Sequence, residues 1–86
     1  MTEIIRKPEF EKAIKKIKDN KTKERVKKQI KKIIESPEHG NFIKYEKNER
    51  KIYIPPFRLL YSYDKREDKI YLIDFDKRDK IYKKRR

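Results

Sequence analysis

The chain has 86 residues, of which 34% are hydrophobic, 50% are charged and none is cysteine, and its formal net charge is +13. This length predicts one small domain, residues 1–86, and the lack of cysteine excludes disulfides and thiolate metal sites. No segment has the roughly 18 apolar residues of a membrane span or the pattern of a signal peptide, so we expect a cytoplasmic protein that binds no membrane.

The positive charge is concentrated in two parts of the chain. Residues 11–35 carry eleven basic and four acidic side chains, and residues 77–86 carry seven basic and one acidic. Residues 58–76 have one more acidic than basic side chain. This distribution favours an anionic partner, which can be RNA, DNA or an acidic protein. A tail that only solubilises the protein is the competing interpretation of residues 77–86.

The first half of the chain predicts a strand followed by two helices. Residues 2–6 suit a short strand, and Pro8 suits the first turn of a helix, where its missing N–H costs nothing. Apolar residues recur at helical spacing over about 8–18 and about 21–35, with lysines on the outer face of the second helix. The break at Asp19 and Asn20 is short, which favours an antiparallel helical hairpin.

After the loop at 36–41 the apolar period changes to two residues, which predicts strands. These strands are expected at 42–45, 50–54, 57–63 and 69–75, with turns at 46–49, 55–56 and 64–68. Strands joined by such short connections pair antiparallel. We therefore predict an α+β fold of order β-α-α-β-β-β, with the helical hairpin packed on an antiparallel sheet of about four strands.

The common catalytic signatures are absent. The chain has no glycine-rich phosphate loop, no histidine pair and no Ser/His or Cys/His set. His39, the single histidine, is interpreted as a surface residue. Asp74 and Asp76 share a strand face and are interpreted as salt-bridge residues rather than metal ligands, so we expect no metal or other cofactor.

Alternation in the sheet groups basic residues with an aromatic one. Lys51 and Tyr53 share one face of their strand, whereas hydrophobic residues on both faces of the next strand leave the orientation of Arg58 open. If the three share the exposed face, they form a cationic patch that can bind a phosphodiester and stabilise a pentacoordinate transition state without metal. A face of ordinary solvated charges is the competing interpretation.

Beyond the last predicted strand, Arg78 and Tyr82 are close enough in sequence to reach back to this patch. A tyrosine there can stack on a base or take part in proton transfer, while lysines neutralise the phosphate backbone. The lysines that we assign to RNA binding in this segment are Lys77, Lys80 and Lys83.

Three segments, in order and at matching spacing, resemble the RelE/ParE toxin superfamily, and more closely its RelE branch. They are the helix end Ile33-Ile34-Glu35-Ser36-Pro37, the hairpin at 50–63 with its aromatic-Arg-hydrophobic-hydrophobic-Tyr run from Phe57 to Tyr61, and the closing run from Asp76 to Tyr82. The resemblance covers nearly the whole chain and implies a RelE-like microbial RNase-type fold.

RelE-type members are ribosome-dependent endoribonucleases that cut mRNA in the A site and inhibit translation. In their metal-free reaction the 2′-hydroxyl attacks the adjacent phosphorus and the 5′-oxygen leaves. Each is held silent by an antitoxin encoded beside it. The resemblance therefore implies the toxin of a type II toxin–antitoxin system, with a cognate acidic RelB-like antitoxin, the ribosome and mRNA as partners. It also implies that toxin and antitoxin form a hetero-oligomer.

The resemblance also implies roles for four residues. Arg58 matches the arginine that clamps the scissile phosphate, and Arg78 matches the arginine implicated in transition-state stabilisation or leaving-group protonation. Tyr82 matches the tyrosine that stacks on an mRNA base and assists proton transfer. Lys51 matches a basic position on the second sheet strand.

The position two residues after Lys51 is often basic in the family, and here it is Tyr53. This difference leaves the general base open. Lys44 or Lys47 in the preceding loop can compensate if that loop folds toward the site, and a lysine base needs a pKa lowered by neighbouring positive charges.

Two alternatives belong to other functional classes. A ParE-like toxin acts on a protein target such as DNA gyrase and lacks this RNase set. A small RNA- or DNA-binding module would use the same basic residues without catalysis.

Overall fold

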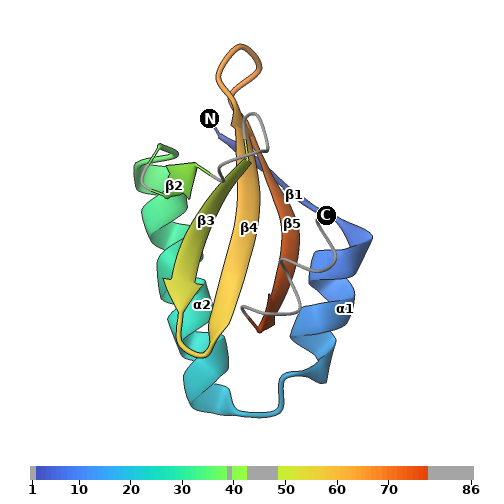
Figure 1. Cartoon of the computed structure of the whole chain (residues 1–86). Coiled ribbons are helices and arrows are strands. Elements are labelled where there is room, and N and C mark those ends of the chain that lie inside the picture. Colours follow the sequence, from blue (N-terminus) through green and yellow to red (C-terminus); the bar gives the residue numbers. More distant parts are fainter. Residues whose placement is uncertain (1, 39, 43–48, 78–86) are drawn as a thin grey trace.

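The structure is a computed structural model that describes residues 2–38, 40–42 and 49–77. Its elements are β1 (Glu3–Arg6), α1 (Pro8–Lys16), α2 (Asn20–Glu35), β2 (Asn41–Phe42), β3 (Glu49–Ile54), β4 (Phe57–Asp64) and β5 (Lys69–Lys77). Both helices lie behind one sheet, α2 on the side of β3 and α1 on the side of β5 (Figure 1). The predicted α+β fold, with two helices packed on one sheet, is confirmed. The sheet has five strands rather than about four, because the two-residue β2 adds a short strand at its edge.

The sheet has the strand order β1-β5-β4-β3-β2. The pairs β2–β3, β3–β4 and β4–β5 are antiparallel, as their short connections predict, but β1 runs parallel to β5. The sheet is therefore mixed rather than wholly antiparallel. The reason is that β1 is connected to the other strands through two helices, and a connection that long permits parallel pairing.

Local sequence accounts for both helix starts. Pro8 occupies the first turn of α1, and Glu9 and Glu11 place negative charge at the positive end of the helix dipole. Asp19 caps α2, because its carboxylate accepts hydrogen bonds from the Lys21 amide at 3.1 Å and the Thr22 hydroxyl at 2.8 Å. The predicted break between the helices is thus the start signal of the second one.

The hydrophobic core fills the space between the helices and the sheet. Phe10 of α1 and Val26 and Ile33 of α2 are buried against side chains from the three long strands. On β4 these side chains include Leu59 and Tyr61, both fully buried. The face of the sheet that carries them is the helix face, and the opposite one is called the open face below.

Candidate nucleic-acid interface

The strand register places the basic residues predicted for the site on one face. Leu59 and Tyr61 belong to the core, so alternation along β4 directs Arg58 and Leu60 to the open face. Tyr53 is paired directly with Arg58, and Lys51 is paired with Leu60. Residues paired in register share a face, so Lys51, Tyr53 and Arg58 lie together on the open face.

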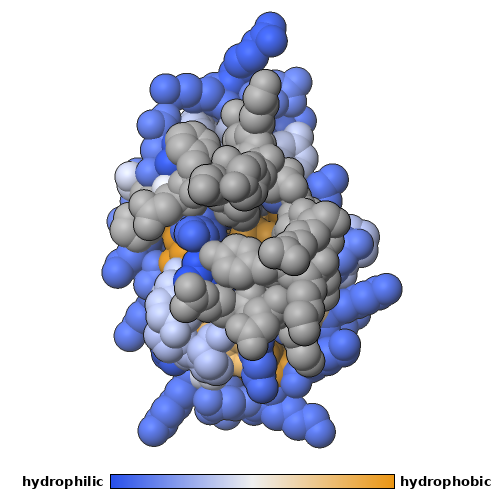
Figure 2. Space-filling view, viewed as in Figure 1, coloured by the Kyte–Doolittle hydropathy of each residue, from blue (hydrophilic) through white to orange (hydrophobic). Residues whose placement is uncertain are grey.

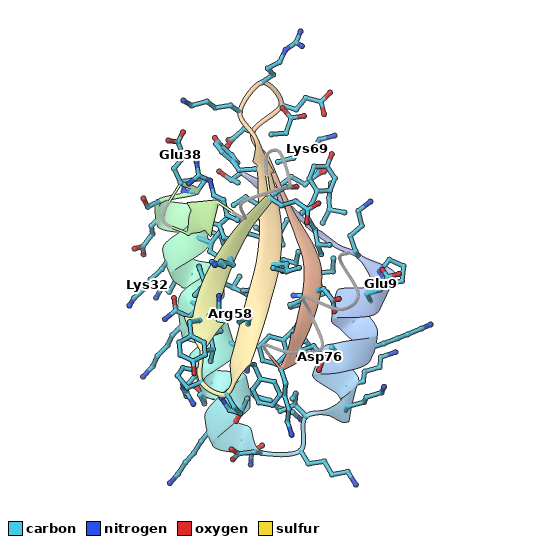
Figure 3. All side chains as sticks on the ribbon, viewed as in Figure 1. Glu9, Lys32, Glu38, Arg58, Lys69 and Asp76 are labelled. Carbon is cyan, nitrogen blue, oxygen red and sulfur yellow. The ribbon has the colours of Figure 1, made fainter. Side chains whose placement is uncertain are left out.

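Arg58 and Tyr53 make direct contact. The guanidinium carbon of Arg58 is 5.2 Å from the centre of the Tyr53 ring, a cation–π distance. Tyr53 is 55% exposed, whereas Arg58 and Lys51 are half-buried. Figure 3 shows Arg58 on the side of the sheet away from the helices. The patch therefore combines an exposed aromatic ring with two half-buried cations.

Two aspartates on β5 are paired with the residues of β4 that face the open side of the sheet. Asp76 is paired with Arg58 and Asp74 with Leu60, beside a β-bulge in β5. Each accepts a hydrogen bond from the next backbone amide, Asp74 from Phe75 at 2.8 Å and Asp76 from Lys77 at 2.7 Å. Within residues 2–38, 40–42 and 49–77, no three His, Cys, Asp or Glu side chains gather closely enough to hold a metal ion.

A groove of about 360 Å³ between α2 and β3 joins the patch at Tyr53. We call it the α2–β3 groove, and its lining includes Arg25, Lys28, Lys31 and Lys32 as well as Tyr53. Arg25 donates a hydrogen bond of 2.9 Å to the carbonyl of Pro55, which ties α2 to the β3–β4 turn. The sequence does not predict this groove, because helical spacing indicates an outer face of α2 but not which strand lies beside it.

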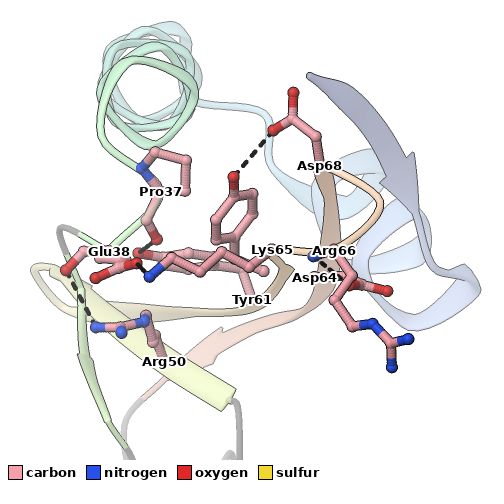
Figure 4. Close-up of polar contacts among 9 residues, drawn as sticks. Pro37, Glu38, Arg50, Tyr61, Asp64, Lys65, Arg66 and Asp68 are labelled. Carbon is pink, nitrogen blue, oxygen red and sulfur yellow. Dashed lines mark hydrogen bonds and ion pairs between the residues drawn. The ribbon is translucent and has the colours of Figure 1, made fainter. Parts of the chain in front are cut away.

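A buried polar contact anchors the end of α2 to the sheet near Lys51. The Tyr61 hydroxyl donates to the carbonyl of Pro37 at 2.9 Å and accepts from the amide of Gly40 at 2.8 Å. Arg50 donates to the carbonyls of Glu38 and Gly40 at 3.1 and 2.8 Å (Figure 4). Burial raises the pKa of the Tyr61 hydroxyl above its ordinary value, so it stays neutral and keeps its proton for Pro37.

The remaining predicted site residues differ in what the structure says of them. Lys77 is exposed at the end of β5. The other six lie outside the described residues, so their placement stays a prediction: Lys44, Lys47, Arg78, Lys80, Tyr82 and Lys83. His39, which is interpreted as a surface residue without a role, also lies outside them.

The surface around the patch is strongly polar. Where the described residues are visible in Figure 2, their surface is mainly hydrophilic, with some hydrophobic surface showing near the centre. Neither helix that the structure describes has the length and apolar composition of a membrane span. The geometry thus offers a cationic, partly aromatic surface of the kind that binds phosphate backbones and bases.

The solved structures that share this fold include three of E. coli RelE, alone or with RelB. The intact E. coli RelBE toxin–antitoxin complex contains a chain with a TM-score of 0.80 and 20% identity, covering 90% of this chain and 96% of that one. The isolated E. coli RelE toxin gives 0.79 and 20%, covering 99% and 95%. An E. coli RelE double mutant with a RelB peptide gives 0.77 and 18%, covering 99% and 94%.

The match at the level of sequence families is equally extensive. No curated protein matches the chain. A family model described as the ParE toxin of type II toxin–antitoxin system, parDE, matches residues 4–82. Because that model spans nearly the whole chain, and the fold is the one seen in RelE, the chain belongs to the ParE toxin family of type II toxin–antitoxin systems, within the RelE/ParE superfamily.

Proposed function

We propose that this toxin is a metal-independent endoribonuclease that cuts mRNA in the ribosomal A site and so stops translation in the cytoplasm. The observation that carries the proposal is the grouping of Arg58, Lys51 and Tyr53 on the open face. This grouping contains the phosphate-clamping arginine that the RelE resemblance assigns. A guanidinium suits that role, because its planar fork of donors matches the oxygens of a phosphate.

The reaction needs a nucleophile from the RNA and charge stabilisation from the protein. The 2′-hydroxyl loses its proton and attacks the adjacent phosphorus, and the 5′-oxygen leaves with a proton, giving a 2′,3′-cyclic phosphate and a 5′-hydroxyl. Arg58 holds the non-bridging oxygens, where negative charge grows in the transition state. Lys51 positions the backbone or accepts the proton, and Arg78 and Tyr82 are proposed to assist leaving-group departure and base stacking.

The toxin is proposed to be silenced by an acidic, RelB-like antitoxin in a hetero-oligomer. A second groove, between α1 and α2, is lined by apolar side chains that include Phe10, Ile14 and Ile30, and its rim carries Lys23 and Lys27. An amphipathic helix with acidic edges would match both features. The E. coli RelBE toxin–antitoxin complex, which contains a chain with the same fold, supports an antitoxin as a partner.

A ParE-like activity on a protein target such as DNA gyrase is the second candidate, and the family model that matches residues 4–82 favours it. Such a toxin needs no phosphate clamp. This candidate therefore predicts that replacing Arg58 leaves the toxic activity unchanged. A non-catalytic RNA- or DNA-binding module is the third candidate, and it predicts binding without strand scission.

The test compares these outcomes on purified components. Toxin separated from its antitoxin is added to programmed ribosomes, and the mRNA ends are mapped chemically. Cuts with 5′-hydroxyl ends support the proposal. Intact mRNA together with inhibited gyrase supercoiling supports the second candidate, and RNA binding without either effect supports the third. Fragments with 5′-phosphate ends would contradict the metal-free mechanism.

A further inference from the structure

The α2–β3 groove combines charge with an aromatic surface. Lys28, Lys31 and Lys32 line it, and none of the three takes part in an ion pair among the residues that the structure describes. Glu35 lies at the C-terminal end of α2 and adds one carboxylate to the lining. The groove therefore keeps net positive charge for a ligand.

Tyr53 connects this groove to the Arg58 patch. Its ring lines the groove, lies 5.2 Å from the Arg58 guanidinium and is more than half exposed. A large exposed aromatic side chain loses little conformational freedom on binding and offers a π-face to any base. Cations along one side of such a ring are the elements that single-stranded RNA requires, since phosphates and bases alternate along it.

We propose that the α2–β3 groove is a subsite for single-stranded RNA, with one base stacked on Tyr53 and the adjoining phosphates held by Arg25, Lys28 and Lys32. The placement of this RNA next to the scissile phosphate rests on the proposed function, because that function assigns the phosphate to Arg58. The groove volume of about 360 Å³ suits a ligand of about one nucleotide.

An acidic peptide fits this groove less well than RNA does. The carboxylates of a peptide would pair with the lysines, but they would not stack on the exposed Tyr53 ring, which the Arg58 guanidinium already contacts. The groove between α1 and α2 offers a peptide far more apolar lining. The two sides of α2 are thus suited to different ligands.

The first test uses two charge-matched variants of the same helix. Lys28→Gln/Lys32→Gln removes two cations from the α2–β3 groove, and Lys23→Gln/Lys27→Gln removes two from the α1–α2 groove. Glutamine keeps helix propensity close to that of lysine. Binding of a fluorescein-labelled 2′-O-methyl oligonucleotide of about eight residues, which lacks the attacking hydroxyl, is followed by anisotropy at graded salt.

We expect the Lys28→Gln/Lys32→Gln variant, called the groove pair, to bind with a shallower slope of log affinity against log salt. The slope should be smaller in magnitude by about 1.4, which is roughly 0.7 for each of the two lost phosphate contacts with a single strand. The control pair should change the slope little. Equal slopes for the two pairs would overturn the proposal, because net charge alone would then explain RNA binding.

The second test addresses the ring. Tyr53→Phe should bind the oligonucleotide as the wild type does, whereas Tyr53→Leu should weaken binding about 5- to 150-fold, the range of a single lost base stack. Tyr53 is exposed, so neither change should affect folding, and circular dichroism checks this. Unchanged binding by the leucine variant would overturn the stacking role.

These measurements separate the subsite from the proposed function, because they use no ribosome and an RNA that cannot be cut. RNA binding through the groove by a toxin that leaves mRNA intact would keep the subsite and reject the nuclease. Cleavage of mRNA by the toxin, together with equal salt slopes for the Lys28→Gln/Lys32→Gln variant and the control variant, would keep the nuclease and reject the subsite. Loss of antitoxin binding in the groove pair, with RNA binding unchanged, would assign the groove to the antitoxin and overturn the proposal.

Discussion

Arg58 lies directly opposite Tyr53 in the β3–β4 ladder, with its guanidinium carbon 5.2 Å from the centre of the tyrosine ring. Exposed contacts of this kind stabilise by about 0.5–1 kcal/mol. Backbone pairing fixes both Cα positions, so the ring limits the orientations that the guanidinium takes before a ligand binds. The pair therefore links the geometry of the sheet to the clamp in the proposed reaction.

Gly40→Ala should destabilise the fold. An added Cβ would lie 2.8 Å from the Tyr61 Cε1 and 2.9 Å from the Lys51 carbonyl oxygen, and neither the buried ring nor the strand backbone can yield easily. Overpacking of this kind costs about 1–3 kcal/mol. Urea unfolding measures it, with Lys18→Ala in the exposed interhelical segment as the control. Equal midpoints for the two variants would contradict the tight contact.

Tyr61→Phe should cost about 1–3 kcal/mol, because the buried Gly40 amide and the Pro37 carbonyl lose their shared partner. The pH dependence has a defined sign. Burial raises the pKa of Tyr61 above 10.0, so its stabilisation is complete below pH 10 and is lost as pH rises through the folded-state pKa. The wild type should therefore lose more stability in strong alkali than the phenylalanine variant. Parallel alkaline curves would contradict this.

Asp19 should make the thermal midpoint sensitive to acid. The Thr22 hydroxyl and then the Lys21 amide lower the pKa of its carboxyl below 3.8, so the capping stabilisation is present above pH 3.8 and is lost as pH falls through the folded-state value. Asp19→Asn keeps a capping oxygen but does not ionise. We expect the difference in midpoint between wild type and this variant to shrink or reverse on acidification. A constant difference from pH 6 to below pH 3 would count against the cap.

Antitoxin association should slow as salt rises. The chain carries a net charge of +13, and attraction to an acidic partner is screened over about 8–10 Å at 0.1–0.15 M salt. Lys23→Glu/Lys27→Glu, at the rim of the α1–α2 groove, should reduce the association rate further. Stopped-flow mixing of separated toxin and antitoxin measures both effects. A rate that is independent of salt would argue against steering.

The sequence predicted most of the fold because its periods are clear. Every helix and long strand was located within a few residues, and the Asp19 break proved to be a helix cap. The parallel pairing of β1 with β5 was not predicted, because a two-helix connection permits either direction and local pattern carries no information about it. The strand expected at 42–45 is described only at Asn41–Phe42.

The candidate site was predicted in part. Alternation predicted that Lys51 and Tyr53 share a face. It could not assign Arg58 to a face, because the adjacent residues Leu59 and Leu60 point to opposite faces of β4 and both are fully buried. Packing of Leu59 against the helices decides it. The α2–β3 groove depends on how one helix docks on a strand, which residue spacing within the helix does not encode. The roles of Arg78 and Tyr82 stay predictions.

The most direct test of the account is Arg58→Ala in cleavage of mRNA on purified ribosomes, with Arg66→Ala in the exposed β4–β5 turn as the matched loss of one arginine. Removal of a preorganised donor to the transition state should lower the cleavage rate about 10²- to 10³-fold. Ribosome binding should change little, and loss of the Tyr53 contact should lower the thermal midpoint by about 2–8 °C. The control should cut at nearly the wild-type rate and leave 5′-hydroxyl ends. A folded, ribosome-bound Arg58→Ala variant that still cuts at nearly the wild-type rate would contradict the phosphate clamp.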